Sequence, residues 1–380
     1  MSAPLFSSAF TLGILGGGQL GKMMLYTTRK WDIGTFVMDK SEDAPAFQGC
    51  DVFFEGDIMD YEAVMEFGQQ VDALTIEIEN VNVEALQELE DLGIAVSPSA
   101  RVLNLIRNKA RQKSFYQEKG IPTASFEVLV QPDVNTNRAF PFIWKSAEGG
   151  YDGKGVKVIR SQEDLNDLPQ QECIYEDMID FELELAVIVA RNASGDIKTY
   201  PVVEMEFHPE ANQVEYVICP ARISDEIAEK ARAIALKVSE AYEHVGLLAV
   251  ELFLTKDGDI LVNEVAPRPH NSGHYSLEGS ITDQFEQHVR CVLDLPLGAT
   301  ESTIGAVMVN LVGDENHTGN VIYDGMQEIL QMPGVTPHIY GKAQTRPFRK
   351  MGHVTVVDQD INEARKRAEV VKNTIKVIAG

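Results

Sequence analysis

The chain has 380 residues, enough for two or three domains with cores of their own. Its 33 basic and 58 acidic residues give a formal net charge of −25, which disfavours nonspecific binding to nucleic acids and anionic membranes. The four cysteines are far apart, with no CxxC or zinc-like spacing, and this predicts a reduced, cytoplasmic setting. No stretch approaches the roughly 18 apolar residues of a membrane span, and we expect no signal peptide.

The first hundred residues alternate predicted strands and helices. Strands are expected over 10–15, 34–38 and 71–78, and helices over 19–29 and 83–92. This order is typical of βαβ units around a parallel sheet. Ser97-Pro98-Ser99 then starts another helical stretch, which continues over 109–119.

A glycine-rich turn follows the first predicted strand. Gly16-x-Gly18-x-x-Gly21, with Asp39 near the end of the next strand, matches a dinucleotide-binding fingerprint. A nicotinamide dehydrogenase would leave the rest of the chain unexplained. We therefore favour a turn that faces a phosphate or substrate at a helix N-terminus, and a plain tight turn stays open. Glu77 and Glu79 end a later strand, where open α/β sheets place their ligands.

Residues 123–220 are rich in predicted strands, and a helix follows them. The strands are expected over 140–145, 156–159, 173–176, 183–190, 199–206 and 214–220. The helix begins at Asp225, has apolar residues at i, i+3, i+4 and i+7, and is expected to close at Gly246.

The run from Gly149 to Gly155 holds four glycines in seven residues, between two predicted strands. Such a loop lets backbone N–H groups converge on an anion, and Lys154 adds charge. It lacks the Walker pattern, so it is not a P-loop of that type. A flexible hairpin tip is the alternative. Lys145, just before the loop in an apolar strand, is either a phosphate ligand, which we favour, or a snorkelling strand end.

Glu251 and Glu264 are expected to face each other across a hairpin. Two apolar runs, 248–254 and 260–265, flank Asp257-Gly258, a strong hairpin signal, and a two-residue turn there would pair the two glutamates. Like charges directly opposite each other destabilise a sheet. One carboxylate splayed into solvent is one interpretation. A divalent cation between them, Mg²⁺ bridging to a nucleotide phosphate, is the one we favour.

The hairpin leads into Pro267-Arg268-Pro269-His270-Asn271-Ser272-Gly273-His274, and its prolines predict a rigid loop beside the metal. They also remove the helical spacing that a zinc site on His270 and His274 would need. Further on, 346–353 concentrates cations, as either a solvated patch or a pocket for an anionic substrate. The chain is expected to end in a charged helix over 361–378.

These motifs together resemble a known family. The runs Gly149–Gly155, Glu251/Glu264 and 263–274 look like the ATP-grasp superfamily, and within it the N5-carboxyaminoimidazole ribonucleotide synthetases of purine biosynthesis. The likeness runs nearly end to end. It implies an α/β ATP-grasp fold with a Rossmann-like parallel-sheet domain (1–101), an ATP-grasp domain (102–298, mobile lobe about 123–182) and a small C-terminal α/β domain (299–380).

The resemblance also implies an activity. The family carboxylates the exocyclic amine of aminoimidazole ribonucleotide with bicarbonate, converting ATP to ADP and phosphate, with one or two Mg²⁺ ions. It implies a homodimer without nucleic-acid or membrane partners. The nearest rival is another ATP-grasp carboxylate–amine ligase, such as a formate-dependent glycinamide ribonucleotide transformylase. A nucleotide-binding regulatory module without turnover is a rival of another class, but simple binding would not need the paired glutamates and the His loop.

Site residues carry over by position. ATP is expected at Lys109, Lys145, Gly150, Tyr151, Asp152, Gly153, Lys154, Gly155, Val156, Glu176, Asp177, Met178, Ile179, Glu184, His208, Asn263 and Glu264. The ribonucleotide is expected at Gln19, Glu77, Tyr151, Asp152, Asn271, Arg349 and Lys350. Arg268, His270 and Lys350 would be catalytic, and Glu251 and Glu264 would bind the metal.

Overall fold

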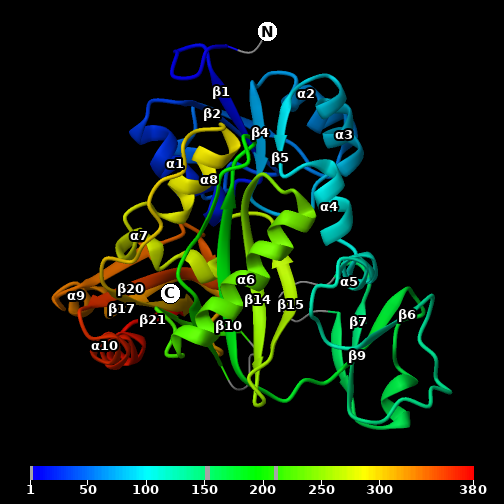
Figure 1. Ribbon diagram of the computed structural model, residues 1–380. Helices are drawn as coiled ribbons and strands as arrows, with labels where there is room; N and C mark the ends of the chain where they lie inside the picture. Colours follow the sequence, from blue (N-terminus) through cyan, green and yellow to red (C-terminus); the bar gives the residue numbers. More distant parts are fainter. Residues whose placement is uncertain (1–2, 150–154, 209–212) are drawn as a thin grey trace.

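The computed structural model describes residues 3–149, 155–208 and 213–380. Figure 1 shows a parallel-sheet domain at the top, a large central sheet below it, a small lobe at the lower right and a C-terminal region at the lower left. No helix in the described parts of the chain is long and apolar enough to cross a membrane.

The N-terminal domain is a five-stranded sheet of order β3-β2-β1-β4-β5, in which every pair is parallel. This confirms the expected βαβ organisation. The short β3 and the helix after it were not predicted. The strands are β1 (Thr11–Leu15), β2 (Gly34–Asp39), β3 (Val52–Glu55), β4 (Ala73–Ile76) and β5 (Ala95–Ser97), and the helices are α1 (Gln19–Lys30), η1 (Phe47–Gly49), α2 (Tyr61–Gly68) and α3 (Val83–Asp91).

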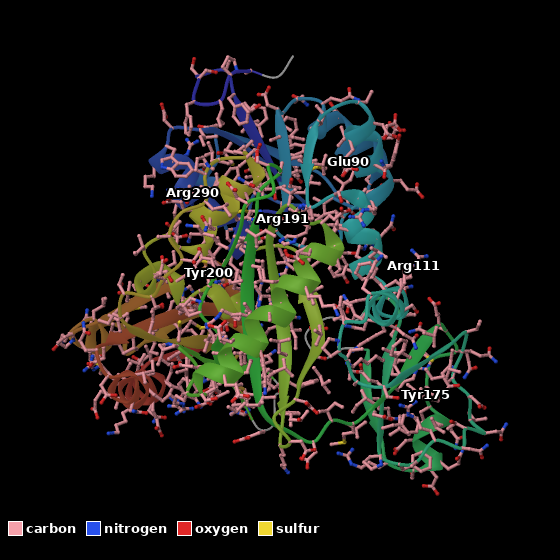
Figure 2. The ribbon with its side chains drawn as sticks, in the orientation of Figure 1. Glu90, Arg111, Tyr175, Arg191, Tyr200 and Arg290 are labelled. Carbon is pink, nitrogen blue, oxygen red and sulfur yellow. The ribbon has the colours of Figure 1, made fainter. Side chains whose placement is uncertain are left out.

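Two helices connect this domain to the small lobe (Figure 1). Ser99 caps α4 (Ala100–Ile106) by accepting the Val102 N–H, and Asn108 caps α5 (Lys109–Glu118) by accepting the Arg111 N–H. The predicted helix start at 97–99 is therefore correct, and Figure 2 labels Arg111 on α5.

The small lobe is a four-stranded sheet of order β6-β9-β7-β8 around a core that includes Trp144 and Tyr175. Figure 2 labels Tyr175 inside this lobe, far from the N-terminal domain. Its elements are β6 (Phe126–Leu129), β7 (Phe142–Ser146), β8 (Val156–Ile159), η2 (Gln162–Leu165) and β9 (Cys173–Asp177).

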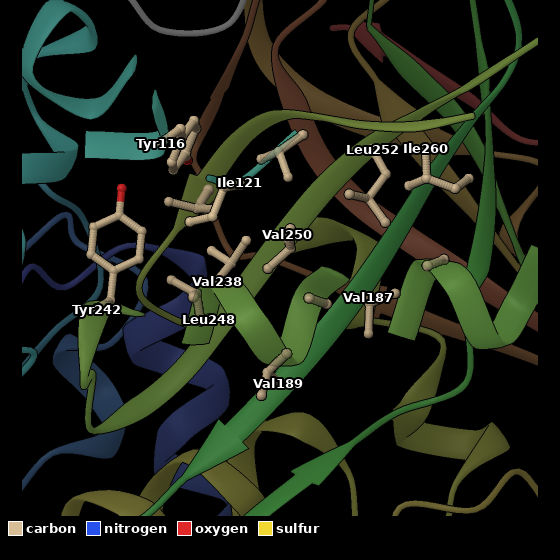
Figure 3. Packing of buried hydrophobic residues seen from close by; sticks show 14 of the residues in the cluster. Tyr116, Ile121, Val187, Val189, Val238, Tyr242, Leu248, Val250, Leu252 and Ile260 are labelled. Atoms are coloured by element: carbon tan, nitrogen blue, oxygen red, sulfur yellow. The ribbon is translucent and has the colours of Figure 1, made fainter. Parts of the chain in front are cut away.

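The large central sheet has nine strands, in the order β15-β14-β10-β12-β13-β16-β20-β18, with β11 added to β10. Its first part consists of β10 (Phe181–Arg191), β11 (Ile197–Thr199), β12 (Val203–Phe207), β13 (Val214–Cys219), β14 (Gly246–Thr255) and β15 (Ile260–Ala266). Helix α6 (Asp225–Tyr242) packs on β10 and β14, and Figure 3 shows Val238 and Tyr242 of α6 against Val187, Leu248 and Val250. The helix ends at Tyr242 with Glu243 in the left-handed region (φ 53°), so the expected close at Gly246 is wrong.

The C-terminal region extends this sheet, because β13 pairs with β16. Three further short strands form a separate sheet beside it. The expected helix over 361–378 is wrong at its end, since 376–379 forms a strand that pairs with β17. The elements are η3 (Asn271–Gly273), α7 (Ser276–Gly279), α8 (Gln284–Val292), β16 (Gly305–Val312), β17 (Gly319–Asp324), α9 (Met326–Ile329), β18 (Val335–Ile339), β19 (Gln344–Thr345), β20 (Lys350–Asp358), α10 (Ile361–Thr374) and β21 (Lys376–Ala379).

Candidate active site

The hairpin of β14 and β15 brings Glu251 and Glu264 together, by a route that differs from the prediction. Leu254 pairs with Ile260, and Gly258 takes a left-handed conformation (φ 83°), so the turn has three residues rather than two. A bulge follows, in which Asn263 and Glu264 together oppose Glu251. The longer turn and the bulge offset each other, and Glu251 and Glu264 end up opposite each other as expected.

The bulge also explains why two consecutive residues of β15 both reach the small lobe. Side chains normally alternate between the faces of a strand. Here Glu264 Oε2 lies 2.8 Å from Lys109 Nζ, and Asn263 Oδ1 accepts a hydrogen bond of 3.3 Å from Lys145 Nζ. Asn263, Glu264 and the two lysines therefore meet between the lobes, as the resemblance implied.

The two glutamates are electrostatically unequal. Lys109 lowers the pKa of Glu264, whereas burial, followed by the charges of Glu264 and Glu184, raises the pKa of Glu251. His270 Nε2 lies 3.5 Å from Glu251 Oε1, and burial lowers the pKa of that imidazole to about 3. Glu251 thus faces another carboxylate and a neutral histidine, and the charges of Lys350 and Lys109 offset only part of the rise in its pKa, which suits a cation between the two glutamates.

Glu184, expected at the ribose, lies on β10 beside β14. Burial and the charge of Glu264 raise its pKa to about 7. The acidic side of the site therefore comprises three carboxylates on three neighbouring strands, in which the pKa values of Glu251 and Glu184 are raised and that of Glu264 is lowered.

On the small-lobe side, Glu176 of β9 binds two lysines. Lys145 Nζ lies 2.6 Å from Glu176 Oε2, and Lys113 forms an ion pair with Glu176 Oε1. All three side chains are nearly buried, and burial lowers the pKa of Lys113 to about 8. The snorkelling interpretation of Lys145 is therefore wrong. Lys113 was missed, although it lies one helical turn after Lys109 on α5.

The rest of the expected adenine segment follows Glu176. Asp177 donates its N–H to Ser125 O (2.8 Å) and forms an ion pair with Arg138. Met178 is exposed and Ile179 half-buried. Since Glu176 uses its side chain on the lysines, only backbone groups of this segment could read a base.

The glycine loop is described only in part. Gly150, Tyr151, Asp152, Gly153 and Lys154 lie outside the described residues. Gly155, in a left-handed conformation (φ 74°), accepts the Ser146 N–H at 2.8 Å, and Val156 pairs with Lys145. The end of the loop is thus fixed directly beside Lys145.

The loop after β15 presents the expected catalytic side chains. Arg268 Nε lies 3.0 Å from Glu79 Oε1, which ties the loop to the end of β4. Asn271 and Asn310 of β16 exchange two amide hydrogen bonds of 2.9 Å. His274 is buried, accepts a hydrogen bond at Nδ1 and stacks on His353. Within the described ranges, no group of three or more His, Cys, Asp and Glu side chains is arranged to hold a metal ion.

The glycine turn of the N-terminal domain binds the protein's own carboxylates. The N–H groups of Gly18, Leu20 and Gly21 donate to Glu77 at 2.7, 3.0 and 2.9 Å, and Gly17 N–H donates to Asp39 at 2.7 Å. A Cβ at Gly18 would lie 2.2 Å from Glu77 Oε1, so the turn requires glycine there. The predicted phosphate-facing turn is therefore wrong for these donors, because Glu77 already occupies the helix N-terminus. Gln19, half-buried, opens α1 beside it.

The basic segment 346–353 meets the site at one end. Lys350 opens β20, and its charge contributes to the lowered pKa of His270 and offsets part of the rise in the pKa of Glu251. Arg349 donates to Gln344 O at 2.6 Å. His208, expected at the nucleotide, lies 6.3 Å from the ring of Phe348 and lines a pocket of about 180 Å³ with it and Asn310.

Comparisons with known proteins agree with this geometry. Three family models match in succession: a ribonucleotide synthetase preATP-grasp domain (9–107), an ATP-grasp domain (114–285) and a phosphoribosylaminoimidazole carboxylase C-terminal domain (306–367). The N5-carboxyaminoimidazole ribonucleotide synthase of Bacillus subtilis (strain 168) is 37% identical over 96% of this chain and 95% of its own.

Two solved structures with related sequences also superpose closely on this chain. The N5-carboxyaminoimidazole ribonucleotide synthetase of Thermotoga maritima superposes with a TM-score of 0.91 at 41% identity, covering 98% of this chain and 100% of its own. The Aspergillus clavatus synthase, solved in complex with ADP and 5-aminoimidazole ribonucleotide, gives 0.87 at 30% identity, covering 97% and 98%. The chain therefore belongs to the N5-carboxyaminoimidazole ribonucleotide synthase family, ATP-grasp ligases of purine biosynthesis.

Proposed function

We propose that this chain performs the family's reaction with Mg²⁺-bound ATP, bicarbonate and aminoimidazole ribonucleotide, and that Glu251 and Glu264 hold the metal. The observation that carries the proposal is the pair of facing carboxylates on β14 and β15, opposite lysines from α5 and β7. Mg²⁺ favours one or two carboxylates plus phosphate oxygens, so two protein ligands suffice. When bound, the metal would neutralise charge on the transferred phosphoryl group.

Lys109 and Lys145 would bind the phosphates. Lys109 is held by Glu264 of β15, and Lys145 contacts both Glu176 of β9 and Asn263 of β15, so both ammonium groups lie between the small lobe and the central sheet. Fixed charges of this kind stabilise a spreading negative charge without reorganising during the reaction. Gly150–Val156 would close over the nucleotide, and the backbone of Glu176–Ile179, Glu184, His208 and Asn263 would complete the nucleotide site.

Phosphorylation would give bicarbonate a leaving group. A bicarbonate oxygen attacks the γ-phosphorus, ADP leaves, and the amine then forms its N–C bond while phosphate departs and the amine proton passes to a base. Arg268 can grip a planar carboxylate through two N–H groups. His270, whose Nε2 lies 3.5 Å from Glu251 Oε1, would accept that proton. Gln19, Glu77, Tyr151, Asp152, Asn271, Arg349 and Lys350 would bind the ribonucleotide.

The function is tested by measuring ADP release with each substrate omitted in turn. ADP release should require both bicarbonate and aminoimidazole ribonucleotide, and formate should not replace bicarbonate. ADP release with formate and glycinamide ribonucleotide would instead support the transformylase alternative, which the relatives' names do not favour. No turnover with either set would favour a binding module.

The proposal of a homodimer rests on the resemblance, and that of a cytoplasmic setting rests on the cysteine pattern. Sedimentation of the purified chain would measure the oligomeric state.

A substitution of Lys350 should affect binding of the ribonucleotide but not of ATP. We expect Lys350→Ala to raise the KM for the ribonucleotide at least about tenfold, because a charge-assisted contact contributes roughly 1.5–3 kcal/mol. The KM for ATP should change by less than about twofold. Lys366→Ala, on exposed α10, is the matched control and should change neither constant. Equal loss of affinity for both substrates would contradict this placement of Lys350.

Glu184 predicts a pH dependence of nucleoside binding. Because its pKa is raised to about 7, the free protein loses the carboxylate, which would accept ribose hydroxyls, as pH falls through 7. Adenosine affinity should therefore weaken below pH 7, by up to tenfold per unit. Adenosine is the probe because it carries no titrating phosphate and needs no metal. The dependence should disappear in Glu184→Gln. A flat profile for the unmodified protein would show that the ribose does not need this carboxylate.

A further inference from the structure

The loop that carries His270 is held by one buried side chain from another element. Gln284, the first residue of α8, has no exposed surface. Its Oε1 accepts the His270 N–H at 2.8 Å, and its Nε2 donates to His270 O at 2.9 Å. Both backbone polar groups of His270 are thus bound by a single amide.

The remaining N–H of the amide is used on the same loop. Gln284 Nε2 lies 2.8 Å from His274 Nδ1, so that nitrogen is the acceptor and the proton of the neutral His274 ring sits on Nε2. An amide turned the other way would place two acceptors together at His270 O. The hydrogen bonds therefore fix one orientation of Gln284 and one tautomer of His274.

Ser276 and Gly273 allow Gln284 to lie close to the loop. Ser276 Oγ accepts the Gln284 backbone N–H at 2.9 Å and donates to Gly273 O at 2.5 Å. A Cβ at Gly273 would lie 2.4 Å from Gln284 Oε1, so the loop needs glycine to approach the amide. The loop residues are thus shaped around Gln284.

These hydrogen bonds determine where the imidazole of His270 lies. Ser272 lies against its Nδ1, with the Oγ at 2.9 Å and the N–H at 3.3 Å, and Nε2 lies 3.5 Å from Glu251 Oε1. The ring direction depends on the backbone of His270, and Gln284 holds both ends of that backbone. We propose that Gln284 is a positioning residue for the carboxylation step, acting through His270. This inference rests on the catalytic role proposed for His270.

Gln287, one helical turn later, supplies a matched control. It is also fully buried, and it exchanges the same pair of backbone hydrogen bonds, of 3.1 and 2.8 Å, but with Gly298 in the segment after α8. Substituting either glutamine with methionine removes one buried amide of the same helix and leaves two backbone groups without that partner. Only Gln284 touches the His270 loop.

The first test compares Gln284→Met with Gln287→Met. In Gln284→Met we expect kcat to fall by about 10- to 100-fold while the KM for ATP stays within about twofold, since a misplacement of about 1 Å can cost 100-fold. Gln287→Met should lower the melting temperature by a similar amount and keep kcat within about twofold. Equal kcat values for the two variants, or joint loss of kcat and ATP affinity in Gln284→Met, would overturn the inference. Gln284→Glu, of the same size but unable to donate as a carboxylate, should show the same loss of kcat if the methionine variant does not fold.

The second test separates this inference from the proposed function. His270→Asn should by itself lower kcat by about 10²–10⁴-fold if the imidazole moves a proton. Adding Gln284→Met should then cost less than about twofold, because a residue that acts through His270 has nothing left to position. A fully multiplied loss in the double variant would overturn the role of Gln284. Wild-type turnover in His270→Asn would instead show that the role proposed for His270 is wrong.

Discussion

Replacing Glu264 with glutamine is expected to lower kcat by about 10²–10³-fold, the loss that follows removal of one strong electrostatic contact to a reacting group. Among the carboxylates of β10, β14 and β15, Glu264 is the one whose pKa is lowered, because Lys109 lies 2.8 Å away, so it stays ionised throughout the neutral range. A neutral amide keeps the shape of the side chain but offers Mg²⁺ a far weaker ligand and leaves Lys109 without its partner. Steady-state ADP release over a range of Mg²⁺ concentrations measures the effect, and excess metal should recover only part of it.

The fold should survive this change. The side chain of Glu264 is 46% exposed, and its removal also relieves repulsion with Glu251 and Glu184. The melting temperature should therefore stay within a few degrees of wild type. Glu226→Gln, which removes the exposed ion pair with Lys230 on α6, is the control and should leave turnover unchanged. Full activity in Glu264→Gln would contradict the metal assignment.

The facing glutamates show what local patterns can predict. Asp257-Gly258 between two apolar runs indicated a hairpin, and the hairpin is present. Its turn has one residue more than expected, and a bulge at Asn263 and Glu264 restores the pairing. A bulge has no short sequence signature, since the buried surroundings select it. The placement of Glu251 opposite Glu264 was therefore predicted correctly through a turn type that was wrong.

The errors elsewhere come from contacts that are distant in sequence. The glycine turn matched an anion-binding pattern, but Glu77, 59 residues after Gly18, fills it. The last residues continued a helical pattern, yet 376–379 pairs with β17. Lys113 looked like an ordinary helical lysine until Glu176 of β9 came within reach. Composition and periodicity contain no information about such partners, and most of the expected site residues come from the resemblance to a family and stay predictions.

Glu176→Gln should have the second large effect, on stability as well as activity. The change leaves the nearly buried Lys113 and Lys145 without their carboxylate. Breaking a buried ion pair by removing one partner costs about 3–5 kcal/mol in the free energy of unfolding. The chain has two tryptophans, Trp31 and Trp144. In a Trp31→Phe background, the fluorescence of Trp144 on β7 therefore reports urea unfolding of the small lobe alone. Turnover should fall too, because Lys145 is no longer held.

The loss of stability in Glu176→Gln should also depend on pH with a definite sign. Burial already lowers the pKa of Lys113 to about 8, and Glu176 opposes that shift, so removing Glu176 lowers this pKa further. A lysine whose folded pKa lies below its unfolded value near 10.5 binds fewer protons when folded, and stability then rises with pH between the two values. Relative to wild type, the variant should therefore recover part of its deficit as pH rises toward about 8, and the recovery should end there because Lys113 of the wild type also loses its proton above that pH. Glu127→Gln, exposed on the neighbouring strand β6, is the control and should show neither the loss nor the slope. A deficit that is constant with pH would mean that Lys113 stays charged by another route, and that Glu176 stabilises the lobe through packing alone.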